Sequence, residues 1–348
     1  MNSAKEASVG WRDTLSGLMP VGGKSKLVAL ALVLYLLIAI ILGMYWSIMP
    51  GPGDVRAEAQ ALAAEGGGTV VTGSVTTAAL ISVVEKMLHK PGGYIRNDRF
   101  PPGVWLDNIS NWEFGALIQV RDLSRAMREA FSRSQSQSKE DVDLAEMEPK
   151  FNFDSTSWIL PSSESVYEDG LTYAYRYFER LSDDKAPEAQ FYARADNLRY
   201  WLATVETRLG SLSQRLSASV GERRINTDLA GDAEASQSTR TAAEQYIQTP
   251  WTEIDNVYFE ARGTAWALIY FLKAVEVDFE DVLRKKNAQV SLQQIIRELE
   301  ATQEMLWSPM VLNGSGFGPL ANHSLVMASY ISRANAAIID LRDLLSQG

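Results

Sequence analysis

Hydrophobic residues recur along this chain at alternating steps of three and four positions in four long segments. The regular stripes begin near Ile109, Phe191, Ile254 and Met327, and each continues over several helical turns. Because residues three and four apart share one face of an α-helix, each segment is predicted to be a long amphipathic helix. Spacing close to a heptad favours helices that pack at shallow angles. The sequence therefore predicts an all-α helical bundle.

Shorter and less regular segments complete this pattern. Apolar residues at helical spacing predict further helices over 164–181 and 291–306. The stretches 132–150 and 221–243 contain few apolar residues and are predicted to be surface loops or partly disordered segments. Alternation of apolar and polar residues with period two is rare, so a substantial β-sheet is not expected.

The most hydrophobic stretch of the chain runs from Leu27 to Met49 and contains no charged residue. Its length of about 23 residues covers the roughly 30 Å hydrocarbon layer of a bilayer. Tyr45 and Trp46 lie where an interfacial aromatic belt is expected, and Pro50 follows directly. A transmembrane helix is favoured over a cleaved signal peptide, whose apolar core is usually about 7–15 residues long.

Basic residues are distributed unequally around this segment. Those that precede it are Lys5, Arg12, Lys24 and Lys26. Only Arg56 follows it closely, so the positive-inside rule predicts that 1–26 is a cytoplasmic tail. The Gly- and Pro-rich segment 50–75 is interpreted as a stalk, and 76–348 as an α-helical domain on the opposite side of the membrane.

The composition excludes several classes of function. The net charge of −10 and the pI of about 4.9 do not provide the basic surface that nucleic-acid binding requires. The chain has no cysteine and only two histidines, His89 and His323, so neither a metal nor another cofactor is expected. His89 lies four residues after Glu85, which is a metal-ligand spacing, but no third ligand is evident. No serine lies in a nucleophile motif.

Two parts of the chain resemble each other weakly. A shift of 148 positions aligns Gly115 with Gly263, together with several neighbouring residues. This pattern raises the hypothesis of an internal duplication with repeats over 102–220 and 250–348. The alternative is that two helices of similar patterning produce such matches by themselves.

The segment 91–115 is the richest candidate for a binding site. Glycines and prolines fix an irregular backbone there, and loops of this kind often bind ligands. The candidate binding residues in it are Tyr94, Arg96, Asp98, Trp105, Asp107 and Asn108. The alternative is structural, with Trp105 and Trp112 closing the end of the bundle and Asp107 or Ser110 capping the next helix.

A pair of carboxylates offers a catalytic hypothesis. If the two similar helices lie side by side, Glu113 and Glu260 approach each other near Arg262, a further candidate binding residue. Two carboxylates about 5–10 Å apart can cleave a glycosidic bond, which would make the domain a murein-cleaving enzyme. Acidic residues are also favoured at the starts of helices by the helix dipole alone, and this explanation is preferred.

Six segments of the chain carry a resemblance to a known family. They read PGGYIRND at 91–98, DNISNWEFGALIQVRD at 107–122, FSRSQSQSKED at 131–141, QFYARADNLRYWL at 190–202, RLGSLSQRLSASVG at 208–221 and LNGSGFGPLANHSLVMASYISRANAAIIDLR at 312–342. The chain resembles the bacterial inner-membrane family known as domain of unknown function 2333. This resemblance implies a Gram-negative host, an inner-membrane anchor and a periplasmic domain, and it implies no activity.

These observations favour a membrane-anchored periplasmic scaffold or adaptor that binds another envelope protein or associates with itself. Its partners would be the lipid bilayer, through Leu27 to Met49, and a protein, but not nucleic acid. The alternative function is a protein that binds or cleaves the cell wall, with the 91–115 segment and Glu113 as its site.

Overall fold

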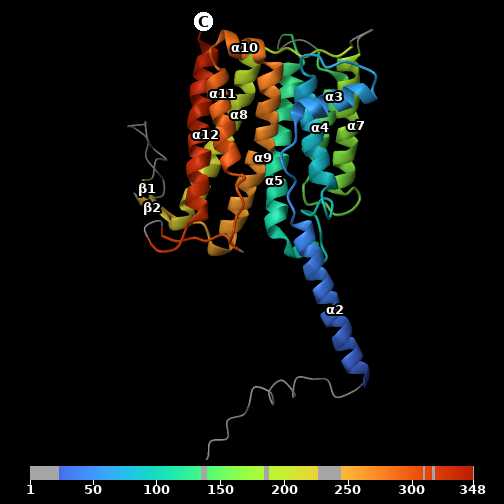
Figure 1. Cartoon of the computed structure of the whole chain (residues 1–348), viewed down its shortest axis with the longest axis vertical. Coiled ribbons are helices and arrows are strands. Elements are labelled where there is room, and N and C mark those ends of the chain that lie inside the picture. Colours follow the sequence, from blue (N-terminus) through green and yellow to red (C-terminus); the bar gives the residue numbers. More distant parts are fainter. Residues whose placement is uncertain are drawn as a thin grey trace, which may run out of the picture.

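The predicted all-α bundle is confirmed by a computed structural model, in which long helices run side by side (Figure 1). The structure describes residues 23–134, 139–183, 188–225, 244–308, 310–315 and 318–347. Consecutive long helices alternate in direction, so that most of their connections lie at the two ends of the bundle.

The helices carry the following bounds: α2 (Gly23–Trp46), α3 (Val55–Glu65), α4 (Ser74–His89), α5 (Asp107–Ala126), α6 (Val142–Phe151), α7 (Ser163–Ser182), α8 (Ala195–Ser217), α9 (Ile254–Asp278), α10 (Glu280–Lys285), α11 (Gln289–Ala301) and α12 (His323–Ser346). A π-helical turn, Met127–Phe131, follows α5. The strands β1 (Glu222–Ile225) and β2 (Glu244–Ile247) form one small antiparallel hairpin.

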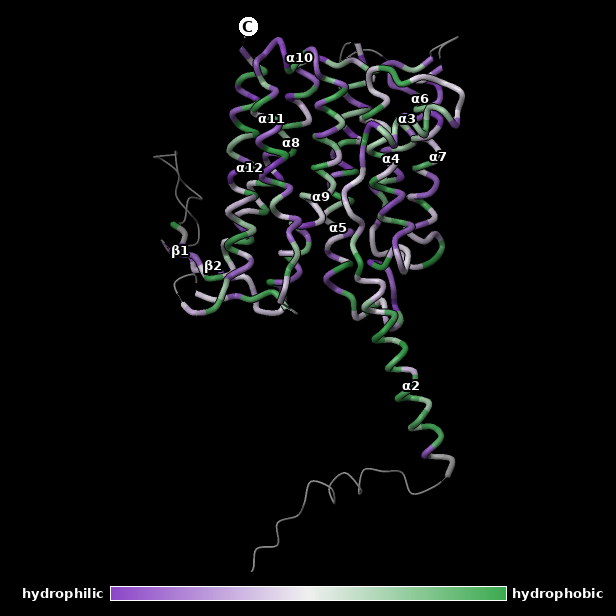
Figure 2. Tube along the Cα trace, viewed as in Figure 1, coloured by the Kyte–Doolittle hydropathy of each residue, from purple (hydrophilic) through white to green (hydrophobic). Residues whose placement is uncertain are grey.

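Helix α2 projects from one end of the bundle and is hydrophobic along most of its length (Figure 2). We call this end the base; it consists of the segments 90–106, 152–162, 248–253 and 302–308. The opposite end is called the far end, and α10 and the C-terminus lie there. In the described part of the chain, Lys26–Trp46 is the stretch that is long and apolar enough to cross a membrane.

Helices α5 and α9 lie together in the middle of the bundle, and glycines allow their backbones to touch. A Cβ atom at Gly115 would collide with the carbonyl oxygen of Glu260, and one at Gly263 would collide with that of Trp112. The indole rings of Trp112 and Trp266 are buried beside this contact, with centroids 4.7 Å apart. Side chains larger than hydrogen at either glycine would force the two helices apart.

The segment 50–75 is packed against the bundle, so its interpretation as a stalk is corrected. Its helix α3 buries Val55, Ala59 and Ala63. Before this helix, the Tyr270 hydroxyl donates a hydrogen bond to the Gly51 carbonyl at 3.1 Å. Figure 1 shows the connection from α2 following the outside of the bundle toward α3. Alanines at helical spacing here form a packing face, which the surrounding glycines obscured in the sequence.

Part of the predicted loop 132–150 is also helical. Asp141 caps α6 by accepting hydrogen bonds from the backbone N–H groups of Asp143 and Leu144. Leu144, Met147 and Phe151 are buried, at the spacing of one helix face. The other polar stretch, 221–243, begins with β1 and continues largely outside the described residues.

The hypothesis of an internal duplication remains a prediction. Part of the order of elements is shared, because α6 and α7 follow α5, while α11 and α12 follow α9 after the short helix α10. The two glycines that the shift of 148 aligns, Gly115 and Gly263, both lie at the contact between α5 and α9.

Candidate functional site

The base is organised around a buried ion pair. Glu113 lies in the second turn of α5, and its carboxylate oxygen is 2.7 Å from the ammonium nitrogen of Lys90, with neither side chain exposed. The carboxylate also accepts hydrogen bonds from the backbone N–H groups of Ile95, at 2.9 Å, and Arg96, at 2.8 Å. Lys90 donates a further bond to the Gly93 carbonyl at 2.5 Å. One glutamate therefore holds the irregular segment that follows α4.

Burial raises the pKa of Glu113 to about 7, although Lys90 and the two N–H groups favour its ionised form. A raised pKa is a common property of a general acid, and here it has a structural cause. Because the carboxyl group is fully buried and fully hydrogen-bonded, a substrate has no direct access to it.

Glu260, the second carboxylate of the catalytic hypothesis, has a separate cationic partner. The Arg215 guanidinium of α8 forms a bidentate ion pair with it, in which one hydrogen bond measures 2.8 Å. Glu113 and Glu260 thus serve two different ion pairs, and neither lines the base cavities described below. This arrangement supports the structural alternative for both residues.

Two of the candidate binding residues, Tyr94 and Arg96, join neighbouring parts of the base. Tyr94 is buried, its hydroxyl donates to the Ser155 carbonyl at 3.0 Å, and its ring meets Tyr167 edge-on. The Arg96 guanidinium donates to the Ser155 hydroxyl and to the Ser110 carbonyl, both at 3.2 Å. These contacts fasten the segment after α4 to the segment between α6 and α7.

The next three candidates lie nearer to the surface. Asp98 is half-buried beside Gly103, and burial raises the pKa of its carboxyl group. Trp105 is exposed. Asp107 is exposed at the first position of α5, where it accepts a hydrogen bond from the next N–H group, while the N-cap position itself is Leu106. The expected cap at Asp107 is therefore only a local contact.

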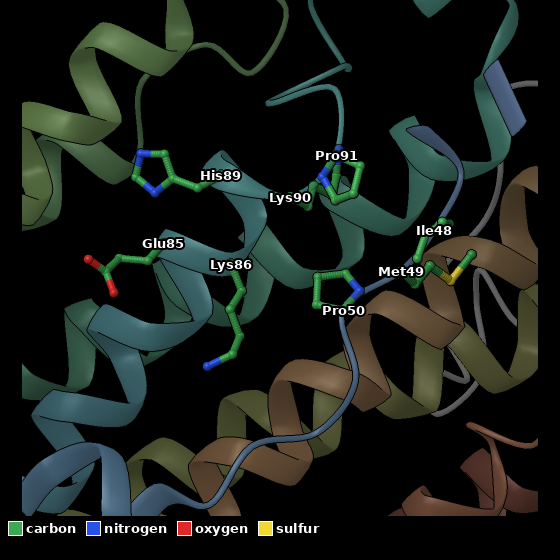
Figure 3. Close-up of a pocket in the computed structure, with 8 residues that line it drawn as sticks. All are labelled: Ile48, Met49, Pro50, Glu85, Lys86, His89, Lys90 and Pro91. Carbon is green, nitrogen blue, oxygen red and sulfur yellow. The ribbon is translucent and has the colours of Figure 1, made fainter. Parts of the chain in front are cut away.

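A cavity of about 360 Å³ opens where the chain leaves α2, between Met49 and the end of α4 (Figure 3). Figure 3 shows that Glu85 and His89 point to one side of α4 and Lys86 to another. Each has a partner: the Tyr175 hydroxyl donates to Glu85, Lys86 pairs with Glu58 at 2.6 Å, and His89 lies 2.9 Å from Glu168. Within the described residues, no group of three potential metal ligands occurs.

A second base cavity, of about 560 Å³, brings together two further candidates, Asn108 and Arg262. Arg262 is held by the carbonyl groups of Gln303 and Glu304, at 2.8 and 2.9 Å. Asp255 also lines this cavity, and burial raises the pKa of its carboxyl group. The candidates that the sequence placed together are therefore divided between a packed cluster around Glu113, the exposed surface and this cavity.

Lys90 was missed by the sequence analysis. A lysine at the end of a helix is ordinarily solvated and stabilises the helix dipole. Its burial follows from the opposing Glu113, which lies 23 positions later and on another helix. No local sequence pattern indicates this contact.

The comparison with family models decides the relationship of this chain to known proteins. A model described as "Uncharacterized protein conserved in bacteria (DUF2333)" matches residues 20–348. The chain belongs to this family. The resemblance identified from the sequence is thereby confirmed over the bundle and α2. Neither the curated proteins nor the solved structures gave a match. The family description states no activity, so the function is argued from the residues themselves.

Proposed function

We propose that this chain is a single-pass membrane protein whose helical bundle is a non-enzymatic scaffold or adaptor of the bacterial envelope. The bundle binds another envelope protein or a second copy of itself. The observation that carries the proposal is α2, an exposed apolar helix joined firmly to a large bundle.

Contacts at the base support a firm junction between the anchor and the bundle. The last residue of α2, Trp46, packs so closely on Gly92 that a Cβ atom there would collide with the indole. One turn earlier, Gly43 faces the side chains of Leu106 and Pro102. A domain attached in this way holds a defined position at the membrane, which a scaffold needs and a soluble enzyme does not.

The ionisable groups of the base support a non-catalytic role. Glu113 and Glu260 each form an ion pair, and neither lines the two base cavities. The charged residues around the cavity in Figure 3 are likewise paired with neighbouring side chains. Catalytic acids and nucleophiles need access to substrate, whereas these groups fasten one segment of the bundle to another.

The excess of basic residues before Leu27, where the apolar part of α2 begins, supports a cytoplasmic N-terminus and a periplasmic bundle at the inner membrane. Fusion of a periplasm-active reporter to Gly348 tests this topology. We expect activity from that reporter and none from a cytoplasmic reporter at the same position. The reverse result would contradict the proposed orientation.

Crosslinking in native membranes tests the scaffold itself. The tagged full-length chain is crosslinked and purified, beside the double variant Glu113→Gln/Glu260→Gln. We expect one defined envelope protein, or a specific oligomer of this chain, from both forms, and the same pair when the tag is moved to the partner. Recovery of murein fragments without a protein partner, lost in the double variant, would overturn the proposal in favour of a cell-wall enzyme.

A further inference from the structure

The base exposes large aromatic and apolar side chains that the core does not use. The most exposed are Leu160 at 90%, Trp307 at 89% and Trp251 at 83% of their surface. Phe100, Trp105 and Trp158 are also exposed. These residues come from four separate connections, so their exposure is a shared property of one end of the bundle.

Direct contacts connect the first two of these segments to the end of α2. Gly43 and Trp46 of α2 pack against the segment 90–106. That segment holds the next one, since the Asn97 amide donates to the Ser157 carbonyl at 2.8 Å. The rings of Phe100 and Trp158 meet edge-on, with centroids 5.8 Å apart.

The other two segments lie at the same end. Met305 lines a cavity together with Ser47 and Met49, the residues that follow α2. Trp251 and Asn313 line a smaller cavity, which places 248–253 beside the chain that follows 302–308. All four connections are therefore part of the surface from which α2 projects (Figure 1).

Tryptophan is divided sharply between this surface and the core. In the described part of the bundle, the exposed tryptophans are Trp105, Trp158, Trp251 and Trp307, and all of them belong to the base. Trp112, Trp201 and Trp266 are buried. Near the far end, Val142 and Val290 are exposed but smaller, and the exposed aromatic residue there is a tyrosine, Tyr200, whose hydroxyl donates to Glu129. Tryptophan is enriched at the interface between lipid and water, where its ring suits a layer that is partly apolar.

We propose that the base lies directly on the bilayer that α2 enters, with its exposed tryptophans in the layer of phospholipid headgroups. This inference rests on the proposed span of α2. Gly43 lies three residues before the end of α2, which is about 4.5 Å along the helix axis, and a Cβ atom at this position would touch Pro102 and Leu106. The base therefore reaches at least to the end of the apolar helix, and its aromatic surface continues the exposed surface of α2.

Site-directed spin labelling of the full-length chain tests this arrangement. The chain contains no cysteine, so each introduced cysteine carries the only label. The base variants are Leu160→Cys and Trp307→Cys. Their matched controls are Val142→Cys and Val290→Cys, which are also exposed but lie near the far end. Ile38→Cys reports on α2.

Each variant is reconstituted in vesicles of phosphatidylethanolamine and phosphatidylglycerol, and the accessibility of the nitroxide to oxygen and to a nickel chelate is compared.

We expect the ratio of oxygen to nickel accessibility at both base positions to exceed that at the two controls severalfold, because oxygen partitions into lipid and the chelate stays in water. Water-like ratios at the base with a lipid-like ratio at Ile38 would overturn this inference and leave the anchor intact. A water-like ratio at Ile38 would overturn the proposed anchor itself. Protection of the base from both reagents, with spin–spin broadening at higher protein density, would assign the surface to a second copy of the chain and also overturn the inference.

Discussion

The base and the far end of the bundle are held together by the same kind of contact. At each end, a buried carboxylate accepts hydrogen bonds from the backbone N–H groups of a neighbouring segment. At the base, Glu113 accepts hydrogen bonds from Ile95 and Arg96. At the far end, Asp278 accepts hydrogen bonds from Gly73, at 2.8 Å, and from Thr76, at 2.6 Å. Each carboxylate joins helices that are distant in the sequence. Glu113 joins α5 to the end of α4, and Asp278 joins α9 to the start of α4.

The two ends differ in what surrounds the buried carboxylate. Glu113 is balanced by the buried ammonium group of Lys90. The carboxylate of Asp278, a residue of α9, lies against the start of α4, where the helix dipole favours a negative charge. It also accepts a hydrogen bond from the Thr76 hydroxyl at 2.7 Å. Exposed tryptophans accompany the base alone among the described residues. Since the far end is secured without them, these aromatic residues are not needed to hold the connections of such a bundle.

The largest effect is expected from Glu113→Ala. This variant leaves two buried N–H groups without an acceptor and leaves Lys90 buried without a counter-charge. We expect the free energy of unfolding to fall by about 3–5 kcal/mol, measured by denaturant titration of the full-length chain in detergent. Glu260→Ala is the matched control, and because its partner Arg215 is partly exposed, a loss of about 1 kcal/mol or less is expected. Equal losses would show that the buried pair has no special role.

A smaller and local effect is expected from Asp278→Ala. Removal of this carboxylate takes the acceptor from Gly73 and Thr76 at the start of α4. Loss of such a cap destabilises a helix by about 0.5–2 kcal/mol, so we expect a decrease near the upper limit of that range. Hydrogen exchange should accelerate at 73–76 and remain slow at Ile95 and Arg96. Faster hydrogen exchange at both ends would show that the two carboxylates do not act independently.

The sequence predicted most of the fold because the long stripes of Ile109, Phe191, Ile254 and Met327 each became a helix with a buried face. Segments with small or few apolar residues were harder to interpret. Helix α3 buries Val55 and two alanines, which contribute little hydrophobic contrast. The capped α6 was concealed in a stretch that is polar as a whole.

The candidate site was predicted less well, because it depends on contacts between distant segments. The sequence placed Tyr94, Arg96 and Glu113 in one candidate segment. In the structure the Arg96 N–H group donates to Glu113, whereas the Tyr94 hydroxyl donates to the Ser155 carbonyl of another segment. The partners of the two glutamates, Lys90 and Arg215, have no pattern that would reveal them in the sequence. Periodicity identifies a buried face, but it does not identify which charged residue lies opposite.

The pH dependence of stability provides a third test of the base. The pKa of Glu113 is about 7 in the folded chain against about 4.5 ordinarily, so between these values the folded state retains a proton that the unfolded chain releases. Stability should therefore decrease as the pH rises through this window and then level off. The pKa of Asp278 is also raised by burial and acts with the same sign.

The variant Glu113→Gln separates the two contributions, because glutamine keeps an acceptor oxygen but does not titrate. Unfolding free energies at about pH 5 and about pH 7.5 should differ less in this variant than in the natural chain. An unchanged difference would assign the pH dependence to Asp278 and to other groups. Such a result would show that the protonation of Glu113 does not set the pH dependence of stability.

The smallest effect on stability is expected from Trp251→Ser and Trp307→Ser. Both indoles are exposed, so their removal in detergent should change the free energy of unfolding by about 0.5 kcal/mol or less. Val290→Ser, an exposed residue near the far end, is the control and should behave alike. If the tryptophan variants instead lose more than about 1 kcal/mol, their rings contribute to packing, and their exposure would no longer distinguish the base. A negligible loss means that the fold does not need these side chains, so that their presence at the end where α2 emerges calls for a role outside the folded domain.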